Sequence, residues 1–219
     1  MTRNALIVWG GWDGHVPDQM ATLFEEMLVA EGFKVEISGS VDSFNDAEAL
    51  KSLNLIVPCI TMGAITEEQT NHVSEAVMAG TGIAGVHGGM CDAFRGNLTW
   101  QWMTGGAFMA HPGDGTVNYP VHIKNSSSEL TRGLEDFTIT SEQYYLHVDP
   151  CIEVLATTPF PIAEGPHDNN RHIEMPVAWT KRWGEGRVYY NALGHVPDNI
   201  NSGTAREMVR RGFLWAAGD

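Results

Sequence analysis

Histidine is the residue type best placed to do chemistry in this sequence, because several histidines follow apolar runs that resemble buried strands. His15, His87 and His195 each lie directly after such a run or in the loop that follows it. In open α/β sheets, ligands bind beyond the carboxyl ends of the strands. If the sheet is doubly wound, these three side chains should therefore converge on one rim.

His87 occupies an unusual position within Gly85-Val86-His87-Gly88-Gly89. This is the spacing of a nucleophile elbow, which exposes one side chain on a sharp strand-to-helix turn. Serine or cysteine is the usual occupant, and a histidine cannot repeat the acyl transfer of a cysteine. Cys91 lies four residues further on, and we expect it to be packed and inert. His87 should therefore bind a metal, move a proton or hold a substrate.

Glu142 is the best carboxylate candidate, because it follows a predicted strand and precedes two aromatic residues that could wall a pocket. His111 follows a glycine loop and could reach the same rim by folding of that loop. Histidines and a glutamate can hold Zn²⁺, Mn²⁺ or Fe²⁺ with an open position for substrate. They can equally act as a metal-free acid and base, and each histidine alone could be merely structural.

These considerations give a set of candidate site residues. We assign catalytic roles to His87, Glu142 and His111, and one divalent metal, Zn²⁺ or Mn²⁺, to His87 and His195. Flat aromatic faces suit sugar rings, and several aromatic residues lie near predicted loops. The candidate substrate-binding residues are Trp12, His15, Tyr144, Tyr145 and Trp179.

Strands and helices alternate over about the first 105 residues. The predicted strands cover residues 4–9, 33–37, 55–60 and 83–86, and the predicted helices begin at Pro17, at about Asp46 and after the capping box Thr66-x-x-Gln69. This alternation predicts a mostly parallel sheet covered by helices on both faces. The loop GGWDG does not match GxGxxG, so we expect no nucleotide cofactor and interpret its glycines as making room for His15.

The second half of the chain is less regular. Further strands are predicted at 116–124, 137–141, 152–157, 175–181 and 187–193, with a hairpin turn at 183–186 and a final helix at about 203–217. Residues 116–124 alternate and contain Pro120, which favours a half-exposed strand at an edge. No linker, repeat or charge block interrupts the sequence, so we predict a single domain over residues 1–219.

The composition of the chain disfavours several classes of partner. A net charge of −14, from 27 acidic and 13 basic residues, disfavours nucleic acid and an anionic membrane surface. No apolar run approaches the roughly 18–20 residues of a membrane span, and we expect a cytoplasmic protein. The three cysteines form no CxxC pair or disulfide framework. A neutral small molecule is an easier partner, and a homo-oligomer stays open.

Several motifs, taken in order, resemble the ThuA-like (trehalose-utilisation) family, a branch of the class I glutamine amidotransferase-like fold. The resemblance covers nearly the whole chain and implies a flavodoxin-like, three-layer α/β/α sandwich. The matching motifs are Gly10-Gly11-Trp12-Asp13-Gly14-His15, Gly85-Val86-His87-Gly88-Gly89, Gly105-Gly106-Ala107-Phe108-Met109-Ala110-His111-Pro112, Glu142-Gln143-Tyr144-Tyr145, Pro176-Val177-Ala178-Trp179, Gly186-Arg187-Val188-Tyr189-Tyr190 and Leu193-Gly194-His195.

The resemblance also carries functional expectations. The amidotransferase relatives hold a catalytic cysteine at the elbow, so His87 implies that this chain does not hydrolyse glutamine. The family is linked to disaccharide utilisation, alongside dehydrogenases that yield 3-keto sugars. We therefore expect a sugar isomerase, lyase or hydrolase acting on a disaccharide or its 3-keto derivative. The alternatives are a non-catalytic carbohydrate or metabolite binder, and a metal-dependent hydrolase.

Overall fold

The computed structural model describes residues 3–113, 115–124 and 128–218. Its strands are β1 (Arg3–Gly11), β2 (Phe33–Ser38), β3 (Leu55–Thr61), β4 (Gly82–Val86), β5 (Gly106–Ala110), β6 (Val117–Ile123), β7 (Phe137–Ser141), β8 (Tyr145–Val148), β9 (Glu153–Phe160), β10 (Ile173–Trp183) and β11 (Gly186–Asn191). Its α-helices are α1 (Pro17–Ala30), α2 (Ala47–Lys51), α3 (Glu67–Met78), α4 (Gly88–Cys91), α5 (Leu98–Thr104) and α6 (Gly203–Ala216). Short 3-10 helices are η1 (Asp13–His15), η2 (Val41–Asn45) and η3 (Pro197–Asn199).

Nine of the described strands form one sheet in the order β2-β1-β3-β4-β11-β10-β9-β6-β7. The first five are parallel to their neighbours, and the remaining four continue the sheet by antiparallel pairing. The predicted α/β fold with a large, mostly parallel central sheet is therefore confirmed. Because β1, β3, β4 and β11 run parallel, the carboxyl ends of β1, β4 and β11 lie at one rim of the sheet.

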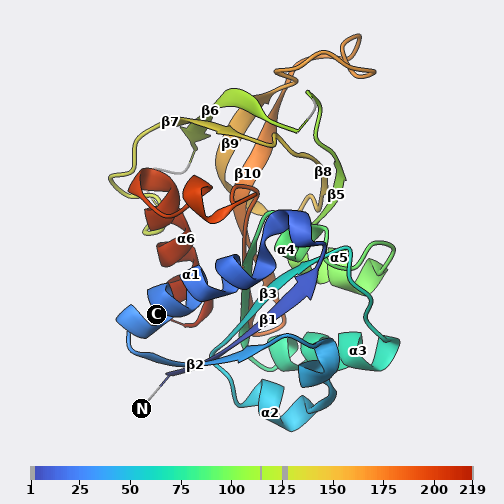
Figure 1. Ribbon diagram of the computed structural model, residues 1–219, viewed down its shortest axis with the longest axis vertical. Helices are drawn as coiled ribbons and strands as arrows, with labels where there is room; N and C mark the ends of the chain where they lie inside the picture. The colour runs from blue at the N-terminus through green and yellow to red at the C-terminus, as the bar shows by residue number, and fades with distance from the viewer. Residues whose placement is uncertain (1–2, 114, 125–127, 219) are drawn as a thin grey trace.

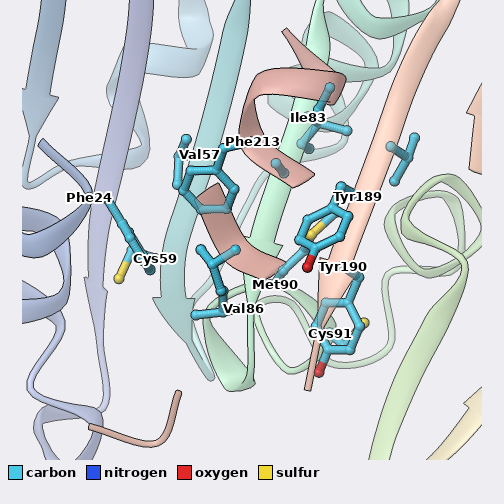
Figure 2. Close-up of a cluster of buried hydrophobic side chains, with 14 of the residues drawn as sticks. Phe24, Val57, Cys59, Ile83, Val86, Met90, Cys91, Tyr189, Tyr190 and Phe213 are labelled. Carbon is cyan, nitrogen blue, oxygen red and sulfur yellow. The ribbon is translucent and has the colours of Figure 1, made fainter. Parts of the chain in front are cut away.

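Helices cover the parallel part of the sheet on both faces (Figure 1). On one face α1 and α6 lie together, with the rings of Phe24 and Phe213 5.1 Å apart. On the other face α3 packs against α2 and receives a hydrogen bond from Trp183 to Ser74. Apolar side chains of the central strands fill the space beneath the helices, as Figure 2 shows for Val57.

Sequence signals for two helices are confirmed in atomic detail. In α1 the buried stripe has the predicted helical spacing and consists of Met20, Leu23, Phe24, Met27 and Leu28. Gly32 follows this helix with a φ of +84°, a conformation that glycine adopts without strain. At α3 the hydroxyl of Thr66 accepts from the Gln69 amide, and the Gln69 side chain accepts from the Thr66 amide.

Two of the three cysteines lie inside the apolar core (Figure 2). Burial raises the pKa of Cys59 to about 12 and also raises the pKa of Cys91. A raised pKa keeps a thiol protonated at neutral pH, which lowers its reactivity. The prediction that Cys91 is packed in the core is confirmed.

Strand β6 is not at the edge of the sheet, contrary to the interpretation of its alternating sequence. It lies between β9 and β7, and β7 forms the edge. The pairing with β9 involves only the end of β6, at His122 and Ile123, whereas Pro120 faces β7. A proline is tolerated here because the ladder with β9 does not extend to it.

The sequence interpretation missed a small second sheet, in which β5 pairs antiparallel with β8. Residues of β5 were predicted as part of a glycine loop, because five residues without polar alternation give no strand signal. The pairing joins segments about forty positions apart, from Gly106 to Val148. This two-stranded sheet matters because it carries Phe108 and leads to His111.

Among the described residues, none of the helices is long and apolar enough to cross a membrane.

An ion-pair network on α6 gives a prediction about stability and pH. Glu207 accepts hydrogen bonds from Arg210 and Arg211, which lower its pKa from 4.5 to about 2. Such a carboxylate stabilises the fold above pH 4.5, and this contribution is lost as pH falls toward 2. We expect Glu207→Gln to lower the free energy of unfolding at pH 6 by about 1 kcal/mol, after allowance for solvent screening.

Urea unfolding of the wild type and the variant at pH 6 and pH 3 measures this effect. The difference between the two proteins should shrink at the lower pH. Glu48→Gln is the control, because Glu48 pairs with Lys51 on an exposed surface and should matter little. An undiminished difference at pH 3 would show that the carboxylate charge of Glu207 is not what stabilises α6.

Candidate functional site

Four polar side chains meet at the rim formed by the ends of the parallel strands. His15, His87, Glu142 and His195 each offer a ligand atom, and these atoms lie within 4.8 Å of one another. His15 follows β1, His87 follows β4 and His195 follows β11, as the strand-end argument predicts. Glu142 directly follows β7, and its carboxylate reaches His87. The structure thus brings together three histidines and the preferred carboxylate, which we call the histidine–glutamate cluster.

The elbow holds His87 in a backbone conformation that is uncommon outside glycine, with a φ of +49°. Its amide donates to the Asn191 carbonyl at 2.7 Å, and the Tyr190 hydroxyl donates to its carbonyl at 3.1 Å. We expected an exposed side chain at this turn, but only 1% of His87 is exposed. The Tyr144 ring stacks on the imidazole at 3.9 Å, which explains why the predicted exposure is wrong.

A glycine of the elbow creates the space in which His15 lies. A Cβ added at Gly88 would come within 2.6 Å of the His15 ring and 2.9 Å of the Thr61 hydroxyl. We expected the glycines of the first loop to make this room, and that expectation is wrong for Gly11. A Cβ there would lie 1.9 Å from the Thr61 carbonyl, so Gly11 accommodates β3 instead.

Hydrogen bonds behind the cluster orient two of its imidazoles. His87 Nδ1 donates to the Ala192 carbonyl at 2.7 Å, and His15 Nδ1 lies 2.8 Å from the Thr61 hydroxyl. Both rings therefore direct Nε2 toward Glu142 Oε2, at 3.0 Å from His87 and 3.8 Å from His15. Metal-binding histidines are commonly oriented in this way, by a hydrogen bond at the second ring nitrogen.

The tautomer of His87 determines what can lie between its ring and Glu142. A carbonyl can only accept, so Nδ1 of His87 carries a proton and a neutral ring presents the lone pair of Nε2 to Glu142. Burial lowers the pKa of His87 to about 4, although the hydrogen bond to Glu142 opposes this shift. Burial alone would raise the pKa of Glu142, but the surrounding imidazoles lower it. The two groups titrate as one pair, so their 3.0 Å contact needs either a shared proton or a cation between them.

One ring nitrogen of His195 also needs a hydrogen-bond partner. Its Nδ1 is buried and has no hydrogen-bond partner among the described residues, although it lies 3.5 Å from Glu142 Oε2. A buried polar atom without a partner costs about 1–3 kcal/mol, so native proteins rarely leave one. A cation between the imidazoles and the carboxylate would give this nitrogen a partner.

Three further predicted site residues border the cluster. His111 Nε2 lies 3.8 Å from Oε1 of Glu142, the oxygen that the other three histidines do not face, and 40% of its side chain is exposed. Trp12 is 46% exposed, and its ring lies 4.8 Å from that of His15. Tyr144 is buried against His87 and forms the inner wall.

The structure does not bring the other two predicted residues to the cluster. Trp179 is fully buried on the central strand β10, and its indole donates to the Thr104 carbonyl at 3.0 Å. It is a core residue and cannot reach a substrate in this conformation. Tyr145 is half-buried on β8, where its ring packs 5.2 Å from that of Phe160. Aromatic type alone could not separate these core positions from the rim.

Sequence reasoning also missed contributors to the site. Thr61 follows a predicted strand directly, so the strand-end argument could have found it. The Ala192 carbonyl is a backbone group whose role no residue type signals. Phe108, whose ring lies 4.5 Å from Tyr144 and 5.9 Å from His111, depends on the β5–β8 pairing that the sequence did not predict.

A family model described as ThuA, trehalose utilisation, matches residues 4–216. The match spans nearly the whole sequence. The chain belongs to the ThuA family, and that membership indicates a role related to sugar metabolism. A search of the curated proteins found no match.

Solved structures share this fold at low sequence identity. A ThuA-like protein from Bacteroides uniformis is 21% identical, with a TM-score of 0.79 over 98% of this chain and 91% of its own. One from Parabacteroides merdae is 16% identical, with a TM-score of 0.77 over 100% and 91%. A protein of Salmonella typhimurium LT2 described as cytoplasmic is 12% identical, with a TM-score of 0.66 over 97% of each chain. These similarities show the fold alone.

The space at Gly88 gives a prediction about the site. Gly88→Ala should displace His15 and lower the free energy of unfolding by about 1–3 kcal/mol, the usual range for overpacking. Gly39→Ala is the control, since a Cβ there would make an ordinary 3.4 Å contact with the Trp9 ring. Chemical denaturation and imidazole NMR shifts report both effects. Unchanged stability and an unmoved His15 resonance would contradict the proposed role of Gly88.

Proposed function

We propose that His15, His87, His195 and Glu142 hold one divalent metal ion, Zn²⁺ or Mn²⁺. The observation that carries this proposal is a buried carboxylate surrounded by three imidazoles, one of which has a buried nitrogen without a partner among the described residues. Three imidazoles and one carboxylate form a donor set suited to first-row metals. The set contains the two predicted ligands, His87 and His195, and adds His15 and Glu142.

The parallel strands follow the order β2-β1-β3-β4-β11, which supports the flavodoxin-like description of this scaffold.

The function that this site supports best is proton transfer on an oxidised sugar. ThuA membership supplies the substrate class, and we infer a disaccharide carrying a keto group as the substrate. A bound divalent metal would act as a Lewis acid that polarises the keto oxygen. His111, half-exposed and 3.8 Å from Glu142 Oε1, is positioned to accept a proton from the carbon beside the keto group.

The electron pair of the broken C–H bond can then form a carbon–carbon double bond. If the neighbouring carbon carries the glycosidic oxygen, that C–O bond breaks, and the proton held by His111 passes to the leaving oxygen. The products are an unsaturated keto sugar and a free alcohol, so no outside oxidant or reductant is needed. If the proton returns to a different carbon instead, the outcome is isomerisation.

Aromatic side chains around the cluster suit a sugar ring. Trp12 presents an exposed face beside His15, and its ring lies where a Cβ on Gly14 would clash at 2.3 Å. The indole is thereby packed closely on the backbone of Gly14, which restricts its orientation. We infer that a sugar ring stacks on Trp12 with its reacting carbon toward His111.

Metal binding gives the first prediction from this proposal. Purified protein loaded with Zn²⁺ or Mn²⁺ should retain one equivalent by elemental analysis. Thr61→Val removes the hydroxyl behind His15 and should weaken metal affinity about 10–100-fold. Thr70→Val, which removes a buried hydroxyl on α3, is the matched control and should leave affinity unchanged. Equal affinities in the two variants would argue against His15 as a ligand.

His111 gives the second prediction, which separates proton transfer from metal binding. His111→Gln should lower kcat on 3-keto-disaccharides about 10²–10⁴-fold, the usual contribution of a general base, without changing metal affinity. His122→Gln, at a half-exposed histidine paired with Glu174, is the control. Retained turnover in His111→Gln would remove His111 from the mechanism, whereas turnover by none of the proteins would favour a non-catalytic binder.

A further inference from the structure

Arg95 lies in the loop after α4, and a buried carboxylate holds its guanidinium in place. Its Nε donates to Asp92 Oδ1 at 2.6 Å, and its Nη2 donates to Oδ2 at 2.8 Å. Only 4% of the Asp92 side chain is exposed, but 56% of the Arg95 side chain is. This bidentate pair fixes the orientation of the guanidinium at low entropic cost and leaves part of it open to solvent.

An unbroken chain of ring contacts connects Arg95 with the histidine–glutamate cluster. Its guanidinium carbon lies 5.5 Å from the centre of the Phe108 ring. The Phe108 ring lies 4.5 Å from Tyr144, whose ring stacks on His87 at 3.9 Å. Phe108 also lies 5.9 Å from His111. Arg95 and His111 therefore both lie next to Phe108, the ring that contacts Tyr144 behind His87.

Part of the guanidinium has no partner within the protein. A guanidinium has five N–H groups, and Asp92 occupies two of them. The Nη1 atom has no hydrogen-bond partner among residues 3–113, 115–124 and 128–218. A fixed planar cation with free N–H groups has the geometry that recognises carboxylates and phosphates.

The charge of the cluster favours the same kind of ligand. This step rests on the proposed function: a divalent ion with one carboxylate and three neutral imidazoles carries one net positive charge. A substrate with an anionic group would balance that charge near Arg95. The chain has a net charge of −14, but attraction at the mouth of a site depends on the nearest groups, since distant charges are screened.

We propose that Arg95 binds an anionic group of the substrate, so that the site accepts an acidic sugar derivative rather than a neutral sugar. The shared chemistry is a sugar ring that bears a carboxylate or a phosphate. Trp12 and Arg95 then have separate roles, because the indole contacts the ring and the guanidinium contacts the charge. Arg95 would determine specificity without taking part in bond breaking.

Calorimetric titration of the Zn²⁺-loaded protein, with the metal-free protein in parallel, tests this proposal with and without a bound metal. The probes are glucuronate, glucose 6-phosphate and glucose, which share a six-carbon sugar ring and differ in the presence and kind of acidic group. At least one acidic sugar should bind wild type ten times more tightly than glucose, and Arg95→Gln should abolish that preference. Arg182→Gln, at an exposed arginine near Trp215, is the matched control and should keep it.

Loss of the charge that balances Asp92 could unfold Arg95→Gln, so Arg95→Lys is measured in parallel. Lysine keeps the positive charge but lacks the planar set of N–H donors of a guanidinium. The Arg95→Lys protein should therefore bind the acidic sugar more weakly than wild type and more tightly than Arg95→Gln. The proposal is overturned if glucose binds as tightly as both acidic sugars, or if folded Arg95→Lys and Arg95→Gln keep the wild-type preference. Failure of metal binding alone would remove the proposed metal and leave this result standing.

Discussion

The buried carboxylate of Glu142, surrounded by imidazoles, is the interaction on which the arrangement of this site depends. The Ala192 carbonyl fixes a proton of His87 on Nδ1, so the other ring nitrogen faces Glu142 at 3.0 Å, and that contact needs a proton or a cation. Several costly features accompany this contact. They include a positive φ at His87, an absent side chain at Gly88 and a buried His195 nitrogen that has no partner in the described part of the chain. The first two hold the imidazoles of His87 and His15 close to Glu142, and a cation among them would give the His195 nitrogen a partner.

The scaffold provides this constraint by bringing distant segments to one rim. Parallel strands β1, β4 and β11 deliver one histidine each, and this part of the account followed from apolar runs and turn residues in the sequence. The elbow, the capping box at Thr66 and the buried cysteines were likewise predictable, because local patterns determine them. Glu142 was a candidate because it follows a predicted strand and precedes two aromatic residues, although the same pattern also fits a surface glutamate beside packed tyrosines.

Other features could not be predicted because they depend on long-range pairing. The β5–β8 sheet joins segments without a local strand signal, and it alone places Phe108 beside Tyr144 and Arg95. Burial of His87 depends on the stacking of Tyr144. Trp179 is buried in the core because β10 lies in the interior of the sheet. Residue type identified the polar candidates better than the aromatic ones, since an indole suits both a core and a sugar.

The account proposed for this site places a metal ion in the histidine–glutamate cluster, assigns the base to His111, and assigns the binding of an anionic group to Arg95. The most direct test of the central claim is anomalous diffraction from crystals of the Zn²⁺-loaded protein. The account predicts one peak bound by His15, His87, His195 and Glu142, at about 2.0–2.2 Å from each ligand atom. A loaded crystal without a peak among these residues, or with Glu142 bonded only to protonated histidines, would contradict it.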